Sequence, residues 1–327
     1  MQYIPYLESE GINVDVSPLL YKDYIKVIYS GKKASYIRIL ISYIARLFIL
    51  TNITKYDVLW IEKELFPGIP AWFEFVISLL GKRYVVDYDD ATFLNYRNTL
   101  FPNKISKVMS MSSYTVCGNG FLMKYAQKAK AKKIKVLPTV VDLNNYTVKE
   151  NKKNDVVIIG WIGAPSTVHY LGSIMDALVS LSENVILEVH VVGAFYDHPG
   201  VKIKCIPWCE KNESKLIQHF DIGIMPLSES SWEEGKCAYK LIQYMACGLP
   251  VIGTDIGANK DVIVHGESGF LAKSHDDWLK YLGALINNPE KRSVMGQFGR
   301  CIVEESYCTN IFLPILKNIL TNKEEEL

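Results

Sequence analysis

Short apolar runs alternate with longer amphipathic stretches along almost the whole chain of 327 residues. Strands alternating with helices of this length are typical of βαβ units, in which helices connect parallel strands. The predicted strands are 12–16, 58–61, 84–87, 114–117 and 135–137 in the first half, then 156–159, 186–192, 201–205, 222–225, 251–253 and 269–272. The alternation therefore predicts an α/β chain with parallel sheets.

A polar segment, DLNNYTVKENKKND at 142–155, interrupts this alternation and has no apolar period, as expected of an interdomain linker. A length of 327 residues also suggests two domains, at roughly 150 residues each. We predict two doubly wound, Rossmann-like domains with a ligand cleft between them, beyond the carboxyl ends of the strands. The predicted parts are an N-terminal domain 1–143, a linker 144–154, a C-terminal domain 155–305 and a C-terminal helix 306–327 that packs back on the first domain.

The start of the chain departs from this plan. A doubly wound domain normally opens with a buried apolar strand. Here Tyr3, Tyr6 and Leu7 instead have the i, i+3, i+4 spacing of a helix face. We therefore expect the first domain to lack its first strand. Its sheet should have an unpaired edge beside 12–16, which would make this domain less stable than the second.

Charge is balanced overall but not along the chain. The formal net charge is +1, which argues against a nucleic-acid-binding protein. Residues 1–150 carry 20 Lys and Arg against 13 Asp and Glu, whereas the remainder carries 16 against 22. A basic first half suits an anionic partner such as a membrane surface or a lipid pyrophosphate. The lysine-rich run 124–135 is either a helix face that docks on anionic lipid or an ordinary solvated face.

The most apolar stretch, 36–50, has the sequence YIRILISYIARLFIL. It is shorter than the roughly 20 residues that span a bilayer, and Arg38 and Arg46 interrupt it. It could lie in a membrane interface with both arginines reaching phosphates, or form a helix buried between the sheet and its neighbours. We favour the buried helix.

Cysteine and histidine usage suggests the cytoplasm and no metal. The seven cysteines form no CxxC pair, as expected of free thiols in a reducing compartment. The six histidines form no HExxH motif or Cys/His cluster. The opening MQYIPYLESE lacks the basic and apolar regions of a signal peptide.

The first candidate site is the segment 156–171, VVIIGWIGAPSTVHYL. An apolar strand runs into Gly160 and Gly163, and Ser166 or Thr167 then caps a helix. Glycines allow close approach of a ligand, and the first amides of a helix bind anions. The segment is therefore a candidate phosphate loop, or else an ordinary tight turn with a good cap.

The second candidate site is the start of the helix that follows Gly235. Lys236 and Lys240 lie there, where positive charge opposes the helix dipole. Lysines at this end become favourable when an anion binds. A diphosphate held between Lys240 and the helix amides would meet positive charge from both sides.

This second segment, GKCAYKLIQYMACGLPVIGT, resembles the core signature of the group 1 (family 4) glycosyltransferases, which have the GT-B fold. Further segments are similar to the family, and the resemblance covers nearly the whole chain, most specifically 220–272. These segments are GWIGAPSTVHYL, FDIGIMPL, GANKDVIVHGESGFLA, VVDYDDATF, VCGNGFL and VLPTVVD.

The resemblance implies transfer of a sugar from a nucleotide sugar, usually with retention and without an essential metal. Lys240 would hold the donor diphosphate, Gly163 would lie in the phosphate-facing turn, and Gln243 would bind the ribose where the family has a glutamate. Two features depart from the family pattern. Gly235 stands where the first signature glutamate is expected, with Glu233 and Glu234 out of register. Trp161 replaces a basic residue, and Lys236 would supply that lost charge.

A third candidate site follows the strand 84–87, in Asp87-Tyr88-Asp89-Asp90. A D-x-D motif can bind a metal beside a nucleotide, but here the nucleotide signatures lie in the other half of the chain. We therefore expect Asp89 or Asp90 to face the cleft and accept the proton of an acceptor hydroxyl. The alternative is that one of them caps the next helix.

The sequence thus predicts a cytoplasmic glycosyltransferase, peripheral on the inner face of the plasma membrane, of the bacterial surface-polysaccharide or lipopolysaccharide type. Its donor would be a nucleotide sugar and its acceptor a glycan or lipid pyrophosphate, with no cofactor or nucleic acid. One alternative is a nucleotide-sugar epimerase of the same fold. The other is a catalytically impaired nucleotide-sugar-binding protein, which the loss of both signature glutamates favours.

Overall fold

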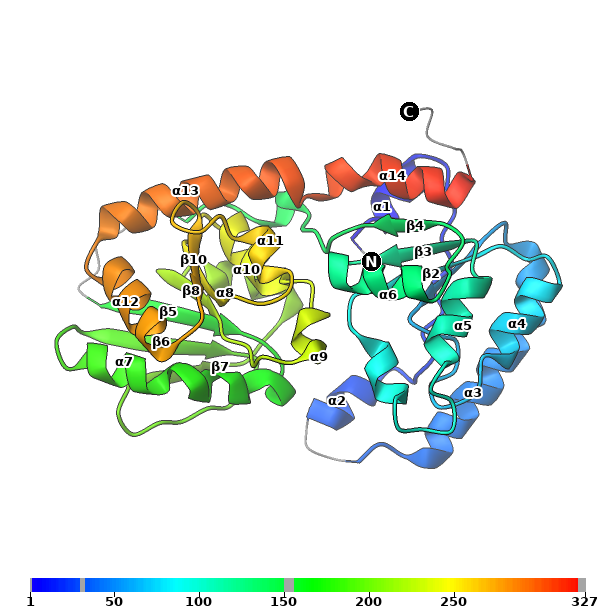
Figure 1. Cartoon of the computed structure of the whole chain (residues 1–327), viewed down its shortest axis with the longest axis horizontal. Helices are drawn as coiled ribbons and strands as arrows, with labels where there is room; N and C mark the ends of the chain where they lie inside the picture. Colours follow the sequence, from blue (N-terminus) through cyan, green and yellow to red (C-terminus); the bar gives the residue numbers. More distant parts are fainter. Residues whose placement is uncertain (1, 30–32, 150–155, 323–327) are drawn as a thin grey trace. The chain divides into compact units, whose positions relative to one another are not determined.

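The computed structural model describes residues 2–29, 33–149 and 156–322, which form two units (Figure 1). The first unit contains residues 3–137 and the chain from residue 315 onward, and the second contains residues 138–314. Both have a parallel sheet with helices, so the predicted α/β class is confirmed.

The first unit is built on a four-stranded parallel sheet. Its strands are β1 (Leu59–Glu62), β2 (Tyr84–Tyr88), β3 (Tyr114–Cys117) and β4 (Ile134–Val136), in the spatial order β1-β2-β3-β4. In the register, Val86 of β2 lies opposite Ile61 of β1 and Thr115 of β3. Val85 and Val86 have no exposed surface, as expected of a parallel strand covered on both faces.

Helices connect these strands. They are α1 (Ile4–Ser9), α2 (Tyr24–Tyr29), α3 (Tyr36–Leu50), α4 (Trp72–Leu79), α5 (Lys104–Met111) and α6 (Gly120–Lys128), with 3-10 helices η1 (Ile53–Lys55) and η2 (Thr92–Tyr96). The last helix of the chain is α14 (Thr309–Thr321), and its residues from 315 belong to this unit. There Ile319 packs against Val85 and Val116.

Residues 12–16 form no strand, contrary to the sequence prediction. Their alternating pattern leaves Ile12 and Val14 only half-buried and Val16 exposed, so it buries too little to hold a strand on the sheet. The helix predicted before them is present as α1. The sheet has β1 and β4 at its two edges, and among the described residues no strand, including 12–16, pairs with the outer side of β1.

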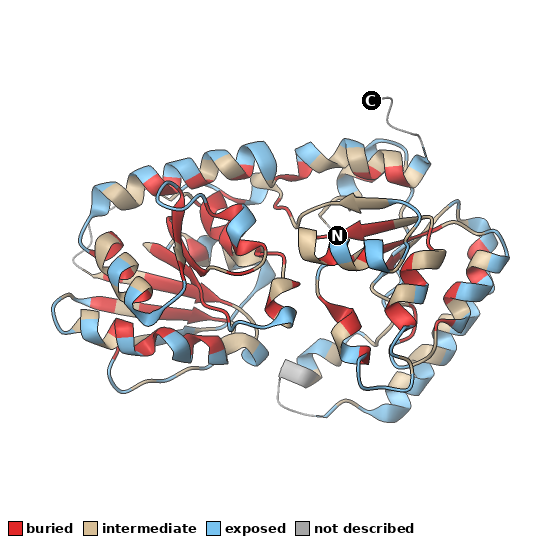
Figure 2. Ribbon diagram, in the orientation of Figure 1, coloured by how far each residue is buried: buried red, intermediate tan, exposed pale blue. Residues whose placement is uncertain are grey.

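Helix α3 is not buried, so the interpretation favoured from the sequence is wrong. None of its residues is buried, as Figure 2 shows along its whole length. Its cap is regular, with the Ser35 hydroxyl accepting from the Arg38 amide. No helix within the described ranges is both long and apolar enough to cross a bilayer.

The second unit has a six-stranded parallel sheet. Its strands are β5 (Val157–Ile162), β6 (Leu187–Val192), β7 (Ile203–Ile206), β8 (Ile222–Met225), β9 (Val251–Thr254) and β10 (Gly269–Ala272). The spatial order is β10-β9-β8-β5-β6-β7. The order reverses at β5, which pairs with β6 on one side and β8 on the other. In doubly wound sheets, ligands bind beyond the carboxyl ends of the strands at such a switch point.

The helices of this unit include the two that carry the candidate site residues. They are η3 (Leu143–Asn145), η4 (Pro165–Ile174), α7 (Met175–Ser182), η5 (Glu210–Asn212), α8 (Glu213–Ile217), α9 (Ser231–Glu234), α10 (Tyr239–Ala246), α11 (Asn259–Val262), α12 (His275–Ile286) and α13 (Pro289–Ser306). A side chain at Gly160 in β5 would overlap the Phe220 ring, with a Cβ placed 1.9 Å from it. Glycine at this position therefore lets that ring pack directly on the central strand.

The predicted linker 144–154 is largely part of the second unit. Tyr146 is buried, and Lys149 donates from its side chain to the Phe220 carbonyl at 2.7 Å and from its amide to Cys247. The polar side chains that suggested a linker thus have partners in this unit. Residues 150–154 of the predicted linker lie outside the described residues.

Candidate functional site

Gly163 and Lys240 lie against one another at the switch point of the second sheet. Gly163 follows β5, and Lys240 is in the first turn of α10. A Cβ built on Gly163 would lie 2.7 Å from Lys240 Nζ and 2.6 Å from the Trp161 ring. Lys240 Nζ also lies 4.4 Å from the centre of that ring. The structure therefore brings together two residues that the sequence placed at the donor phosphates.

The ammonium group of Lys240 is in an unfavourable environment. Burial, with a smaller contribution from Lys236, lowers the pKa of Lys240 to about 7. In the described part of the chain, no carboxylate lies within ion-pair distance of Lys240 Nζ. A buried cation that lacks a counter-ion destabilises the fold unless an anion binds beside it. This geometry favours an anionic ligand.

The turn that leads into α10 is strained. Its N-cap residue, Ala238, has a φ of 53°, in the left-handed region that non-glycine residues rarely adopt. Its carbonyl accepts from the Leu241 amide at 3.0 Å. Such strain persists where the surrounding structure holds the backbone in place, which is frequent at ligand sites. The Tyr239 and Lys240 amides, the first two of α10, have no acceptor within the helix, so they are available to an anion.

Lys236 lies in the segment between α9 and α10. Its Nζ is 6.0 Å from the centre of the Trp232 ring. It is close enough to Lys240 for its charge to contribute to the lowered pKa. Two cations on one side of a turn repel each other, and a diphosphate would compensate both.

Ser166 and Thr167 do not cap the helix after the glycine turn, contrary to the prediction. The segment is the 3-10 helix η4, whose N-cap residue is Ala164. The Thr167 amide and hydroxyl both donate to the Ala164 carbonyl, at 2.9 and 3.0 Å. This local bond to a carbonyl uses the hydroxyl that was expected to cap the helix. Ser166 is exposed near Gly163 in the chain.

Gln243 belongs to a buried hydrogen-bond network in the second unit. Its Nε2 donates to the Tyr146 hydroxyl at 2.9 Å and to Glu213 Oε1. Glu213 also accepts from Tyr146 at 3.1 Å and from Trp208 Nε1 at 2.6 Å. The donors of Gln243 are therefore engaged within the protein. Glu213 and Tyr146 were not predicted from the sequence, because nothing in the spacing of these residues and Gln243 links three positions so far apart.

Glu233 is a buried carboxylate near this site. Burial opposes its ionisation, but hydrogen bonds from Ser230 and Tyr170 outweigh burial and lower its pKa. These bonds connect the start of α9 to η4. The geometry therefore gives Glu233 a positioning role within the second unit.

Asp89 and Asp90 follow β2 in the first unit, and both form ion pairs with one lysine. Lys63 Nζ lies 2.9 Å from Asp89 Oδ1 and 3.0 Å from Asp90 Oδ2. Burial alone would lower the pKa of Lys63, but the two carboxylates raise it above its ordinary value. The next helix, η2, has Ala91 as its N-cap residue and no side-chain cap. The alternative that Asp89 or Asp90 caps this helix is therefore wrong.

Asp87, at the carboxyl end of β2, was not selected from the sequence. Burial, with the negative charges of Asp89 and Glu62, raises the pKa of Asp87 to about 7. A group with a pKa near the ambient pH is well matched to proton transfer. The signal was present in the run of three acidic residues, but the sequence did not indicate which of them is the most buried.

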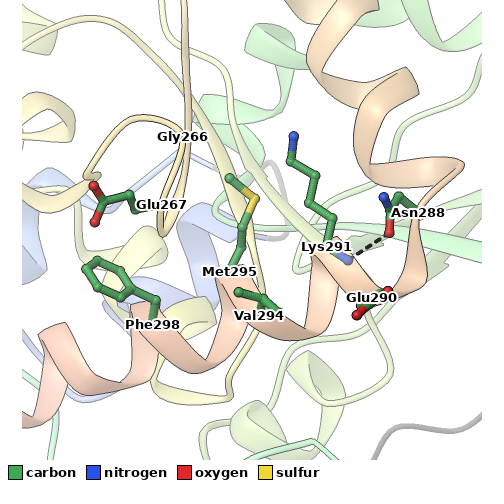
Figure 3. Close-up of a pocket in the computed structure, with 8 residues that line it drawn as sticks. All are labelled: Gly266, Glu267, Asn288, Glu290, Lys291, Val294, Met295 and Phe298. Atoms are coloured by element: carbon green, nitrogen blue, oxygen red, sulfur yellow. Dashed lines mark hydrogen bonds between the residues drawn. The ribbon is translucent and has the colours of Figure 1, made fainter.

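A separate pocket of about 460 Å³ lies at the start of α13. It contains none of the predicted site residues, and Lys291 and Phe298 are among the residues that line it (Figure 3). The Lys291 amide already donates to Asn288 Oδ1 at 2.8 Å, as a helix cap. Within the described residues, no group of three or more His, Cys, Asp or Glu side chains could hold a metal ion.

The second unit is similar to a family of known proteins. Residues 153–288 match the family model described as glycosyl transferases group 1. A 132-residue stretch is 28% identical to spore coat protein SA of Bacillus subtilis (strain 168) and covers 38% of this chain and 32% of that protein. The chain's matches span about a third or less of the curated relatives.

Two solved structures share the fold over nearly the full chain. A glycosyltransferase from Rickettsia africae ESF-5 has a TM-score of 0.70 at 15% identity, over 100% of this chain and 94% of that one. Anabaena Alr3699/HepE, solved in complex with UDP and glucose, has a TM-score of 0.65 at 13% identity, over 97% and 88%. Residues 153–288 therefore match the glycosyl transferases group 1 family, and the whole chain has the GT-B fold of these solved glycosyltransferases.

Proposed function

We propose that the chain is a glycosyltransferase that moves a sugar from a nucleotide-diphosphate sugar to a glycan or lipid-linked acceptor. The observation that carries the proposal is the position of Lys240. Its half-buried ammonium lies against Gly163 and Trp161, with no carboxylate partner in the described chain. A donor diphosphate would supply the missing counter-charge.

In this proposal the leaving diphosphate is stabilised by Lys240, Lys236 and the first amides of α10. These groups supply the positive charge that a metal would otherwise provide, so transfer is metal-independent and needs no cofactor. Turnover in excess chelator, compared with turnover in added Mg²⁺, tests this part. Stereochemistry is proposed as retaining and is tested by NMR of the anomeric proton of the product.

In the first unit, Lys63 holds Asp89 and Asp90, and Asp87 lies beside them at the carboxyl end of β2. We propose that Asp89 or Asp90 orients the acceptor hydroxyl and accepts its proton. The basic first half favours an acceptor on an anionic membrane, at the cytoplasmic face, in surface-polysaccharide synthesis. The spore coat relative and the UDP-bound Anabaena structure support this acceptor class and a uridine nucleotide, respectively.

The test of donor binding compares two lysines of the second unit. Lys240→Ala should weaken UDP binding about ten- to a hundredfold, since a charge-assisted phosphate contact is worth roughly 1.5–3 kcal/mol. Lys280→Ala removes an exposed lysine on α12 and should leave affinity unchanged. Calorimetric titration of both variants gives the comparison. An unchanged dissociation constant for Lys240→Ala would refute the diphosphate assignment.

One observation favours a second function, that of a nucleotide-sugar-binding protein without turnover. Gly235 replaces the first signature glutamate, and the donors of Gln243 are engaged with Tyr146 and Glu213. Such a protein would bind UDP and UDP-sugars equally well and release no UDP from any of them. A screen of UDP-sugars with glycan and lipid acceptors distinguishes the two functions.

A further inference from the structure

Helices α3 and α4 of the first unit both turn their apolar side chains outward. On α3 the exposed large side chains are Tyr36, Ile37, Leu40, Ile41, Ile44, Leu47, Phe48 and Ile49. Beside them, the exposed side chains of α4 and its C-cap residue are Trp72, Phe75, Val76, Leu79 and Leu80. We call these thirteen side chains the outward apolar face. Phe48 and Trp72 are 69% and 66% exposed.

The two helices pack together through Phe66, which follows β1. Its ring lies 5.3 Å from the Tyr43 ring of α3 and 4.6 Å from the Phe73 ring of α4. The Tyr43 hydroxyl also donates to the Pro67 carbonyl at 2.8 Å. The two helices therefore present one surface, as Figure 2 shows by their largely exposed outer sides.

One charged side chain of each helix bonds to the protein, whereas Arg38 of α3 is exposed beside the Tyr21 ring. The Arg46 guanidinium donates to the Ser17 carbonyl at 2.6 Å. This side chain thus bonds to the protein, although much of α3 is exposed to solvent. Glu74 of α4 is buried and accepts from the Leu65 amide at 3.0 Å. In a helix that faces water the arrangement is reversed, with charges outward and apolar side chains inward. The outward apolar face is therefore arranged for an apolar environment.

The segment that contains α3, between Asp23 and Asp57, carries positive charge only. Residues 24–56 contain six Lys and Arg and no Asp or Glu. Lys33 and Lys55, before and after α3, are exposed. In a symmetric dimer through this face, the positive charges of one copy would lie against the same positive charges of the other copy and repel them. Apolar side chains flanked by cations are instead typical of helices that lie in the headgroup region of an anionic bilayer.

We propose that the outward apolar face docks the chain on an anionic membrane surface. At 15 residues, α3 is about 22 Å long, too short to cross a hydrocarbon core of about 30 Å, so it lies in the interface plane. Trp72 and Phe48 enter the acyl boundary, and Lys33 and Lys55 meet the phosphates. This proposal rests on the proposed function in one respect: the membrane would be the one that contains the lipid-linked acceptor.

The test measures binding of the full chain to vesicles of phosphatidylcholine with and without phosphatidylglycerol. Wild-type chain should float with the anionic vesicles, and the Trp72 emission should shift to the blue. Phe48→Ser and Trp72→Ser should each weaken partitioning about tenfold or more, since burial of one aromatic side chain is worth at least about 1.4 kcal/mol, a factor of ten. Both residues are exposed, so the fold is preserved.

Matched controls separate this face from other surfaces. Phe195→Ser removes an equally exposed phenylalanine from the second unit and should have no effect. Lys33→Ala and Lys55→Ala should each weaken binding about fivefold, on phosphatidylglycerol vesicles only. Lys124→Ala and Lys128→Ala, on α6, should leave binding unchanged.

Three results would overturn the proposal. The first is that wild type, Phe48→Ser and Trp72→Ser bind vesicles equally well, and the second is that wild type does not bind anionic vesicles. The third is that the chain forms a dimer and binds no vesicles, and that both serine substitutions dissociate this dimer. UDP affinity, measured on the same samples, should be equal in all variants. Failure of the wild-type chain to bind UDP would count against the proposed function and not against the docking face.

Discussion

The Tyr244 hydroxyl of α10 lies 2.9 Å from the backbone amide of Ile162, the last residue of β5. Tyr244 is fully buried, and its ring packs against Phe220 and the glycine of β8. This bond connects the helix that carries Lys240 to the strand that leads into Gly163. This buried bond therefore helps to fix the distance between Lys240 and the glycine turn.

Tyr244→Phe should therefore reduce both stability and donor binding. The Ile162 amide would lose its acceptor while remaining buried, at a cost of about 1–3 kcal/mol in the free energy of unfolding. UDP affinity should fall as well, because Lys240 and Gly163 lose their common support. Urea denaturation and calorimetric titration measure the two effects. Tyr36→Phe, at an exposed tyrosine, is the control; equal stability of both variants would contradict the role given to this bond.

UDP binding should weaken as pH rises above 7. Burial and Lys236 lower the pKa of Lys240 to about 7, so the free protein loses this positive charge as pH passes through that value. Bound diphosphate favours the protonated lysine, and the dissociation constant should rise up to about tenfold per pH unit above 7. Lys240→Arg keeps its charge and should give a flatter profile. A wild-type profile as flat as that of Lys240→Arg would count against a role of this lysine in binding.

Restoring the family's glutamate at position 243 should harm the protein. In Gln243→Glu a second carboxylate would lie beside Glu213 inside a buried network, and like charges repel strongly there. We expect a loss of about 1–3 kcal/mol in the free energy of unfolding. Exchanging both residues, Gln243→Glu with Glu213→Gln, should recover most of the loss. Additive losses in the double variant, measured by denaturation, would show that the two residues do not interact.

Asp90→Asn should lower sugar transfer while leaving UDP affinity unchanged, because Asp90 is in the first unit. Loss of a half-exposed ion pair with Lys63 should alter stability by no more than about 1 kcal/mol. The measurement is turnover with a panel of UDP-sugars and lipid acceptors. Asp23→Asn, at an exposed residue in a loose pair with Lys26, is the matched control. Full turnover by Asp90→Asn would remove this carboxylate from the mechanism.

The alternation of strands and helices predicted the α/β class, because parallel strands buried on both faces leave a strong apolar signal. The segments that carry Gly163, Lys236 and Lys240 could also be selected from the sequence, since each segment is short and continuous. The network of Gln243, Glu213 and Tyr146 was not, because its members meet only through tertiary packing.

The predictions for 36–50, 12–16 and Thr167 were wrong because tertiary packing and local bonding decide how such segments are used. The 36–50 stretch is apolar enough for a core helix, and sequence alone does not show which side of an apolar helix faces the protein. Residues 12–16 alternate like a strand, yet their side chains bury too little surface to hold a strand on the sheet. Thr167 has the chemistry of a cap, but its hydroxyl bonds to the Ala164 carbonyl in a 3-10 turn.

The division of the chain has a consequence for its dissection. The second unit is one continuous insertion, 138–314, within a first unit assembled from two separate stretches. The insertion can be excised with a single pair of cuts, whereas a fragment that ends at Leu137 loses Ile319 from its contact with Val85 and Val116. A cut in the polar segment would remove Tyr146 and Lys149 from the unit they stabilise. Fragments intended to fold alone should therefore follow the packing boundaries and not the polar stretch of sequence.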